Sequence, residues 1–428
     1  MLRFMSRQFL PHLLLLGAVS IFSLTLAAVE LTVTPDRVDG VYQPGQMVTW
    51  TITVTEVPAE ALGYTVKAGG VQDVAAGKLM FADGKATVSA SWSEPGTLLL
   101  AVAHDKKTSY GGAAYAWDKI PVSAPEPADF DAFWQGKIAE LQAVPMDAKL
   151  EAVESGEANV DLWKITMGNI RGSKIHGYFA RPKGNAPCPA MLAVQWAGVY
   201  PLQKQWSVNP AKSGWMVLNL IAHDLPIDEG KAFYDAQNAG ALKGYPTIGN
   251  DDRELSYFLR MYLSCYRGAD YLIQRSDWNK TTLLSQGGSQ GGLQAIMVAG
   301  LHPGVTAVTA NVPAGCDHTG EQVKRMPGWP HWVQSWSGKD VAKMTTASTY
   351  YDVVNFARRI KGPVLVGMGL IDTTCAPAGV FAMFNQIPGP KRVVIMPTAD
   401  HSRPHDAYYP VMGAWWGAAK DGKAVPLK

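Results

Sequence analysis

Hydrophobic and polar residues alternate in short runs over the part of the chain that follows residue 28. Apolar side chains recur at every second position in these runs, which are Leu31 and Val33, Val48 to Val54, Tyr64 and Val66, Val88 to Trp92, and Leu98 to Val102. Pro-Gly and Asp-Gly pairs, which favour turns, separate several of the runs. This alternation is typical of strands that are buried on one side only. It predicts a small all-β domain, an Ig-like sandwich, over residues 29–123.

The hydrophobic period changes after a proline-rich junction at residues 123–129. Phe130, Phe133, Trp134, Ile138 and Leu141 follow the spacing of an amphipathic helix. Farther on, alternating runs at 162–166 and 175–180 predict an antiparallel sheet edge. Continuous apolar runs at 190–195, 215–221, 282–285, 305–312, 364–370 and 392–396 then predict strands that are buried on both faces, with helical segments between them. We therefore expect a mostly parallel α/β domain over residues 124–428.

Composition agrees with two folded domains and narrows the choice of partners. The chain has 428 residues, of which 47% are hydrophobic and 17% are charged, so it can bury a large core. The formal net charge is only +2, and Arg3 and Arg7 of the expected export signal account for it. Because nucleic acid binding needs a basic surface, nucleic acid is not an expected partner.

The first 28 residues have the features of an export signal. Arg3, Arg7 and His12 precede an apolar run from Leu13 to Leu26, and small residues follow at Ala27 and Ala28. An uncleaved membrane anchor is the alternative, but the run is about 14 residues long and a membrane-spanning helix needs roughly 20. We expect a cleaved signal peptide and a secreted or periplasmic protein that has no membrane contact after cleavage.

The chain contains four cysteines, Cys188, Cys265, Cys316 and Cys375, in apolar or motif-rich segments. They show no C-x-x-C spacing, and four cysteines are too few to form a disulfide scaffold in a chain of this length. We expect buried free thiols rather than disulfides.

A G-x-S-x-G pattern surrounds Ser289, between the apolar run 282–285 and a helical run that starts at Leu293. This pattern places a serine on a sharp strand-to-helix turn, where glycines allow the backbone segments to approach closely. The pattern alone is common, and a turn without chemistry is the alternative. The strand before it and the helix after it favour Ser289 as a nucleophile.

An acidic residue and a histidine follow two later strands. Asp372 comes after the run 364–370, and His401 comes after the run 392–396. The order Ser, Asp, His is that of the α/β-hydrolases, in which the histidine takes the proton of the serine and the acid orients the histidine. A helix cap at Asp372 and an ordinary loop histidine at His401 are the alternatives, and His405 could replace His401.

A serine nucleophile of this kind also needs two backbone N–H donors for the oxyanion and a pocket for the acyl group. The N–H groups of Gln290, directly after the nucleophile, and of Val199, in the loop after the run 190–195, are the candidate donors. Trp196 and Pro313 are bulky residues at strand ends and are candidates to bind the substrate. We find no metal-binding motif and no phosphate-binding loop, so no metal and no cofactor is expected.

A tryptophan-rich segment, MPGWPHWVQSW from Met326 to Trp336, falls between two strands, where hydrolases insert lids. Its indole rings could stack on a sugar, or they could hold the lid against the core.

Several motifs together resemble the acetyl xylan esterase and cephalosporin C deacetylase family of carbohydrate esterases. They are VQWAGV at 194–199, GGSQGG at 287–292, YDVVNFA at 351–357 and GLIDTTCAP around Asp372. The resemblance covers about Asp129 to the C-terminus. Where the family usually has Arg-Gly-Gln after the second core strand, this chain has Ala222-His223-Asp224. The N-terminal sandwich is additional to the family pattern.

The resemblance implies an α/β-hydrolase that removes acetyl groups from sugar hydroxyls through an acyl-enzyme. It implies Ser289, Asp372 and His401 as the triad, Val199 and Gln290 as oxyanion donors, and an acetylated carbohydrate or a small acetate ester as substrate. Whether the protein forms a homo-oligomer stays open. A broad ester hydrolase, a peptidase of the same fold and a non-catalytic glycan-binding protein are the rival hypotheses. All motif residues lie after Asp129, so we expect the sandwich to be an accessory module, or alternatively a glycan-binding one, and to be dispensable for small-ester hydrolysis.

Overall fold

The computed structural model describes residues 30–427 except 185 and 403, so the predicted signal peptide lies outside the described residues. The larger part is built on a sheet of nine described strands in the order β17-β16-β15-β14-β12-β13-β11-β10-β9. The strands are β9 (Lys149–Val153), β10 (Val160–Gly168), β11 (Lys174–Pro182), β12 (Cys188–Val194), β13 (Met216–Leu220), β14 (Trp278–Gly288), β15 (Ala307–Asn311), β16 (Val364–Gly369) and β17 (Lys391–Met396). Strands β12 to β17 are parallel and β9 to β11 are antiparallel, as the runs predict.

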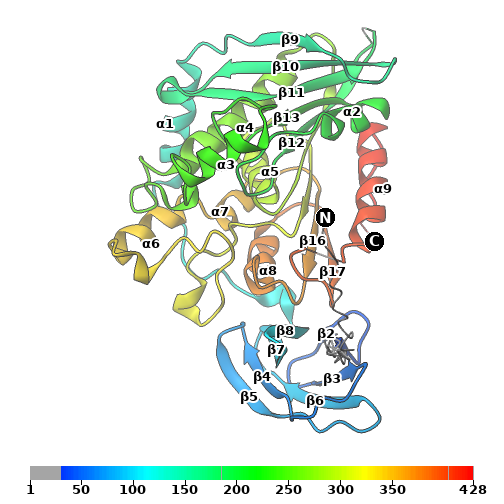
Figure 1. The fold of residues 1–428 in the computed structure, drawn as a ribbon. Helices are drawn as coiled ribbons and strands as arrows, with labels where there is room; N and C mark the ends of the chain where they lie inside the picture. Colours follow the sequence, from blue (N-terminus) through cyan, green and yellow to red (C-terminus); the bar gives the residue numbers. More distant parts are fainter. Residues whose placement is uncertain (1–29, 185, 403, 428) are drawn as a thin grey trace, which may run out of the picture.

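Helices cover both faces of this sheet because its parallel strands are apolar on both sides. Ala190 and Leu192 of β12 join the core under one set of helices, whereas Met191 and Ala193 face the other set. The first set is α1 (Phe130–Gln142), α4 (Tyr257–Gln274), α5 (Gln290–Leu301), α7 (Val353–Ala357) and α8 (Pro377–Gln386); the second is α2 (Gln205–Lys212), α3 (Lys231–Ala239) and α9 (Tyr408–Lys420). Helix α6 (Val341–Thr349) lies at the periphery (Figure 1). This is the α/β-hydrolase architecture that the sequence predicts.

The N-terminal part is all β and consists of two sheets. Strands β1 (Leu31–Pro35), β3 (Met47–Val54) and β6 (Lys85–Ser91) form one sheet, and β2 (Val41–Tyr42), β8 (Lys107–Tyr115), β7 (Gly96–His104), β4 (Gly63–Ala68) and β5 (Gln72–Lys78) form the other. The alternating residues of both sheets, among them Trp50, Val66 and Leu100, meet in one buried cluster. Strands β2, β5 and β8 were not expected from the alternation.

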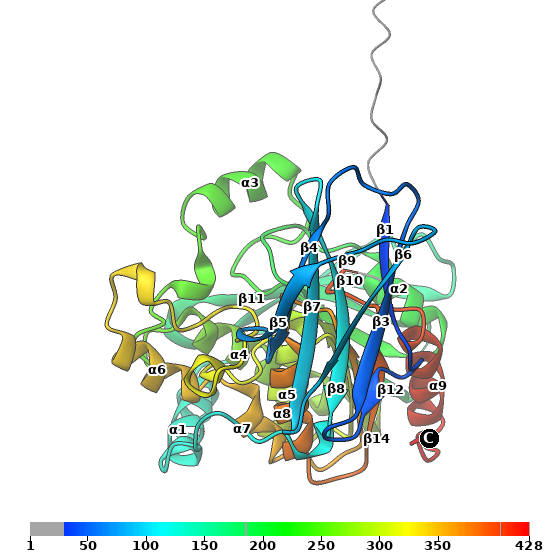
Figure 2. The ribbon, with the colours of Figure 1, turned by 90° about the horizontal axis from the view of Figure 1, so that it is seen from below.

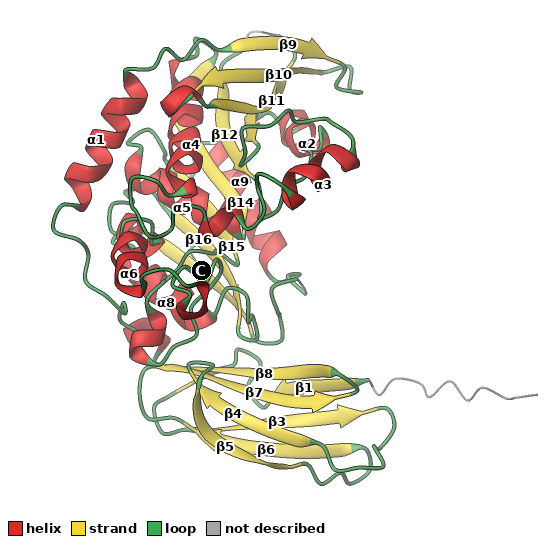
Figure 3. Ribbon diagram, turned by 60° about the vertical axis from the view of Figure 1, so that its left-hand side comes forward, coloured by secondary structure: helices red, strands yellow, loops and turns green. Residues whose placement is uncertain are grey.

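The two parts are in contact, with β8 on the side of the sandwich that is nearest the α/β part (Figures 1 and 3). Seen from below, the sandwich strands lie across the α/β part, with α3 and α6 to one side and α9 to the other (Figure 2). The short 3-10 helix η1 (Trp117–Lys119) leads from the sandwich toward α1, and Trp117 stacks on Phe381 of α8 with ring centroids 5.2 Å apart.

Two further expectations concern the membrane and the cysteines. Among the described residues, no helix combines the length and the apolar character that crossing a membrane requires. Cys188, Cys265, Cys316 and Cys375 are all buried free thiols, which confirms the expectation for these residues.

Candidate active site

Ser289 occupies the turn between β14 and α5 in a strained backbone conformation, with φ 55° and ψ −123°. Close packing explains the glycines around it. A Cβ on Gly287 would lie 2.4 Å from the backbone of Gly291, and a Cβ on Gly291 would lie 2.5 Å from the carbonyl oxygen of Val194. The turn therefore needs glycine at these positions and holds the serine at the carboxyl end of the sheet.

His401 lies between Ser289 and Asp372. Its Nε2 is 2.9 Å from Ser289 Oγ, and its Nδ1 is 2.8 Å from Asp372 Oδ2. The three residues come from loops after β14, β16 and β17, whose carboxyl ends share one edge of the sheet. With Nδ1 donating to the carboxylate, Nε2 is free to accept the serine proton, which is the arrangement of a charge-stabilised general base.

His405 takes another position. Its Nδ1 is 2.9 Å from Asn311 Nδ2, and its Nε2 is 3.0 Å from the carbonyl oxygen of Asp400. Both ring nitrogens are thus occupied, one by the end of β15 and one by the loop that carries His401. Of the two histidines considered from the sequence, the structure brings His401 to the serine.

Asp372 is buried, with its side chain 1% exposed, and the loop that follows satisfies its second oxygen. Oδ1 accepts hydrogen bonds from the N–H groups of Thr374 at 2.8 Å and Cys375 at 2.7 Å. These bonds fix the carboxylate, so that Oδ2 faces the imidazole.

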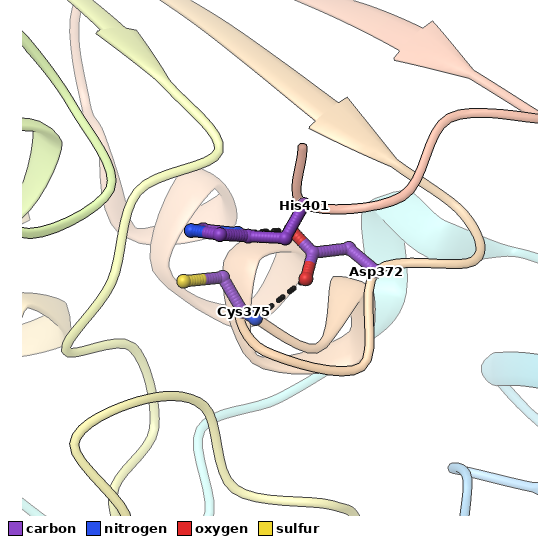
Figure 4. A group of neighbouring side chains, drawn as sticks. All are labelled: Asp372, Cys375 and His401. Carbon is purple, nitrogen blue, oxygen red and sulfur yellow. Dashed lines mark hydrogen bonds and ion pairs between the residues drawn. The ribbon is translucent and has the colours of Figure 1, made fainter. Parts of the chain in front are cut away.

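Cys375 is a neighbour of Ser289, Asp372 and His401, and the sequence motif contained it without indicating a role. Its thiol is buried and touches the Ser289 hydroxyl, and burial raises its pKa well above the usual value, so it stays a neutral thiol. Ligand-type atoms of Asp372, Cys375 and His401 lie within 4.8 Å of one another (Figure 4). Asp372 and His401 already bind each other there, and the expectation of no metal stays a prediction.

The loop after β12 carries the second candidate oxyanion donor and is held by buried polar groups. Gly198 has φ 124°, and its carbonyl oxygen accepts a hydrogen bond from His223 Nε2 at 2.9 Å. His223 Nδ1 accepts from the Tyr257 hydroxyl at 2.6 Å. Burial lowers the pKa of His223 to about 4, so its ring is neutral at pH 7 and can make both bonds.

Tyr245 connects this loop to the nucleophile turn. Its hydroxyl accepts a hydrogen bond from Gly198 N–H at 3.3 Å and donates to Gln290 Oε1. Gln290 is the first residue of α5, where a backbone N–H has no partner within the helix and points out of the N-terminus. The N–H groups of Val199 and Gln290 therefore belong to two segments that Tyr245 joins.

Of the two candidate substrate-binding residues, Pro313 is buried and lies 3.0 Å from the position that a Cβ on Gly292 would take. Trp196 is 49% exposed, stacks on Tyr200 at 5.3 Å and meets Trp206 of α2 edge-on at 4.8 Å. It borders a cavity of about 330 Å³ between α2 and α9, together with Gly287 and Gly288 of the nucleophile turn.

The tryptophan-rich segment is partly packed on the core and partly exposed. Trp332 is fully buried, stacks on Tyr351 with ring centroids 5.1 Å apart and donates from Nε1 to the carbonyl oxygen of Asn250, so this ring packs on the core. Trp336 is 73% exposed. The backbone N–H of Trp329 donates to the carbonyl oxygen of Thr374, which ties the segment to the loop of Asp372.

Sequence reasoning did not identify His223, Tyr245, Tyr257 or Cys375 as parts of the site. His223 had a signal, because it follows a core strand at a position where the resembled family usually has a different triplet. Tyr245 lies in the short 3-10 helix η3 (Tyr245–Thr247) and Tyr257 is the first residue of α4; neither belongs to a motif, and their positions follow only from the fold.

Comparison with known proteins agrees with this architecture. A sequence profile of the acetyl xylan esterase (AXE1) family matches residues 119–409. The acetyl esterase Axe7A of Xylanibacter ruminicola is 30% identical over 387 residues, which cover 88% of each chain. The solved structures of acetyl xylan esterase 1 from Thermoanaerobacterium sp. and of an acetyl xylan esterase from Paenibacillus sp. R4 each superpose with a TM-score of 0.61 at 22% identity, covering 69% of this chain and 96% of theirs.

Proposed function

The chain belongs to the acetyl xylan esterase (AXE1) family and is a carboxylic ester hydrolase, and from this premise we propose that it deacetylates carbohydrates with Ser289, His401 and Asp372 as its catalytic triad. One observation carries the proposal: the imidazole of His401 lies within hydrogen-bond distance of both Ser289 Oγ and Asp372 Oδ2. Family membership supports the reaction class, and this geometry supports the choice of residues.

In the proposed first half-reaction, Ser289 Oγ attacks the acetyl carbonyl carbon while His401 Nε2 takes the hydroxyl proton. The negative charge on the carbonyl oxygen is stabilised by the N–H groups of Gln290 and Val199. The tetrahedral intermediate then breaks its bond to the sugar oxygen, which leaves with the proton from His401. Asp372 stabilises the imidazolium throughout and stays ionised.

In the second half-reaction, His401 takes a proton from water, and the resulting hydroxide attacks the acetyl-serine. Acetate leaves and Ser289 regains its proton. Every proton transfer uses His401, so no metal or cofactor is required.

We also propose that the protein works outside the cytoplasm. The supporting feature is the sequence of residues 1–28, with its basic start, apolar run and small residues at Ala27 and Ala28. N-terminal sequencing of the protein secreted by its host tests the proposal. The expected first residue is Ala28 or Val29, and an exported chain that retains its first 28 residues would contradict cleavage.

The triad is tested by Ser289→Ala. We expect kcat for 4-nitrophenyl acetate to fall by about 10⁴-fold or more with unchanged circular dichroism, because the variant loses the nucleophile but only one hydroxyl. Ser213→Ala is the matched control, since Ser213 is an exposed serine at the end of α2. A Ser289→Ala enzyme with near wild-type kcat would overturn the triad.

A substrate panel separates the carbohydrate esterase from its rivals. Acetylated xylan, xylose tetraacetate, 4-nitrophenyl acetate and a peptide anilide are compared at equal concentration. We expect acetate release from the sugars and no anilide cleavage. Preferential anilide cleavage would favour the peptidase, and binding of xylan without acetate release would favour the non-catalytic protein.

A further inference from the structure

The sandwich packs against the loop that carries the triad acid. A Cβ on Gly112 of β8 would lie 2.5 Å from Leu370 Cβ and 2.6 Å from the Leu370 carbonyl oxygen. Leu370 precedes Asp372 by two residues and is 1% exposed. Because part of this contact is with the Leu370 backbone, a side-chain rotation cannot relieve it. The absence of a side chain at Gly112 thus permits β8 and the acid loop to touch.

Gly112 itself is held within the sandwich. Its carbonyl oxygen accepts a hydrogen bond from Trp50 Nε1 at 3.2 Å, and Trp50 is fully buried in the sandwich core. Its neighbour Leu99 on β7 borders a small gap at the interface together with Asp372. The surface that supports Leu370 is therefore part of a paired sheet rather than a flexible loop.

The same side of the sandwich reaches the histidine loop. A Cβ on Gly40 would lie 2.8 Å from Leu370 Cδ1 and 3.0 Å from Pro397 Cβ, and Pro397 precedes His401 by four residues. Backbone hydrogen bonds join the acid loop to the histidine loop. Leu370 N–H donates to the carbonyl oxygen of Met396, and Ile371 N–H donates to that of Ala399. Leu370 therefore lies where the loop that carries Asp372 meets the loop that carries His401.

We propose that the N-terminal sandwich is a positioning part of the active site, in which Gly112 and Gly40 seat Leu370 and thereby place Asp372 against His401. The proposal rests on the triad proposed above. It departs from the expectation that the sandwich is dispensable. That expectation rested on the position of the motif residues after Asp129 and took no account of contacts between the sandwich and their loops.

Gly112→Ala in the full-length protein tests the proposal. Ordinary contact begins near 3.4 Å, so the new methyl group must move Leu370 by about 1 Å, and misplacement by 1 Å costs roughly 10²-fold in rate. We expect kcat for 4-nitrophenyl acetate to fall 10- to 100-fold with KM changed less than twofold. Gly63→Ala is the matched control in the same domain, because a Cβ there meets only Gly77 at 4.0 Å, and it should retain kcat.

A double-mutant cycle identifies the route of the effect. If Gly112 acts through Asp372, Gly112→Ala should cause no further loss of kcat in an Asp372→Asn background. An equal loss in both backgrounds, or an unchanged kcat in a folded Gly112→Ala protein, would overturn the proposal. Full activity of Asp372→Asn alone would instead overturn the proposed triad, so the two failures are distinguishable.

Leu370→Ala provides the same test from the other side of the interface, and it applies even if Gly112→Ala does not fold. It removes the side chain that is seated between Gly40 and the acid loop and leaves the backbone free to move. Leu365→Ala is the control, because Leu365 lies on β16, which ends directly before Leu370, and is also buried but belongs to the opposite core. We expect both variants to be less stable and only Leu370→Ala to lose kcat at a temperature where both are folded; equal kcat would overturn the proposal.

Discussion

His318 is a fully buried histidine with no hydrogen-bond partner for either ring nitrogen among the described residues. Its ring packs against Trp332, with centroids 5.2 Å apart. Burial lowers its pKa to about 3, against an attraction from Asp317 that raises the pKa. The folded protein therefore keeps His318 neutral at pH values where an unfolded chain would protonate it near pH 6.5. Acid thus favours the unfolded state through this residue, and stability is lost as the pH falls from about 6.5 toward 3.

We predict that His318→Phe weakens the dependence of stability on pH. Between pH 7 and 4.5, His318 should lower the free energy of unfolding of the wild type by roughly 2–3 kcal/mol, at about 1.4 kcal/mol per pH unit below 6.5. Asp352 acts in the opposite direction, because burial raises its pKa to about 6, but it is present in both proteins and cancels in the comparison. Urea unfolding at the two pH values measures the difference. If the variant and the wild type lose equal free energy of unfolding between the two pH values, His318 does not contribute to the pH dependence.

At the scale of elements, the loop after β12 lies beside the nucleophile turn. It contains Trp196, Gly198 and Val199, and it is tied to Gln290 through Tyr245. A hydrophobic pocket distinguishes acyl chains by only about 1–3 kcal/mol per methylene. Strong preference for acetyl groups must therefore come from side chains that close the pocket, and Trp196 and Pro313 are the proposed ones.

We predict that kcat/KM falls steeply from acetyl to butyryl and octanoyl esters of 4-nitrophenol. Replacing Trp196 by Ala should raise the butyryl-to-acetyl ratio by about tenfold, a change equivalent to roughly 1.4 kcal/mol. Trp336→Ala, which removes a more exposed indole from the tryptophan-rich segment, should leave the ratio unchanged. If the wild type prefers octanoyl esters, the acyl pocket is open and these residues do not close it.

On the scale of the whole molecule, the sandwich and the α/β part share buried surface. Ala114 of β8 and Ile120 belong to the same hydrophobic cluster as the core of the α/β part. Trp117 stacks on Phe381, and Asn385 Nδ2 donates to the carbonyl oxygens of Trp117 and Ile120 at 2.8 and 3.1 Å. Domains that share this much packing are expected to unfold together rather than independently.

We predict a single transition when residues 29–428 are unfolded in a calorimeter. Trp117→Ala should lower stability by about 2 kcal/mol, less than the roughly 3–5 kcal/mol of a fully buried tryptophan, because Trp117 is only partly buried. Loss of this contact should also broaden the transition or split it. Two transitions in the wild type would mean that the sandwich unfolds on its own.

The sequence by itself determined the main strands of the α/β sheet and which candidate site residues follow them. Long apolar runs mark β12 to β16 because both faces of these strands are buried. The run at 392–396 also marks a strand, but β17 lies at the sheet edge and is only half-buried, contrary to the expectation. Ser289, Asp372 and His401 follow β14, β16 and β17. Hydrophobic period and turn chemistry are local properties, so they can be predicted from neighbouring residues. The choice between His401 and His405 rested on distance from a strand, and in the structure His401 Nε2 lies 2.9 Å from Ser289 Oγ, whereas His405 Nδ1 lies 2.9 Å from Asn311 Nδ2.

Only the tertiary structure decided what surrounds these residues. Strand β8 was not expected because Gly111 and Gly112 interrupt its alternation of apolar and polar residues. Glycine is needed at these two positions because Trp50 and Leu370 occupy the space that a side chain would fill. His223 and Tyr245 likewise gain their partners from distant segments. Such contacts join residues far apart in the chain, and no local pattern encodes them; the physical reason is that close packing is a property of the folded molecule as a whole.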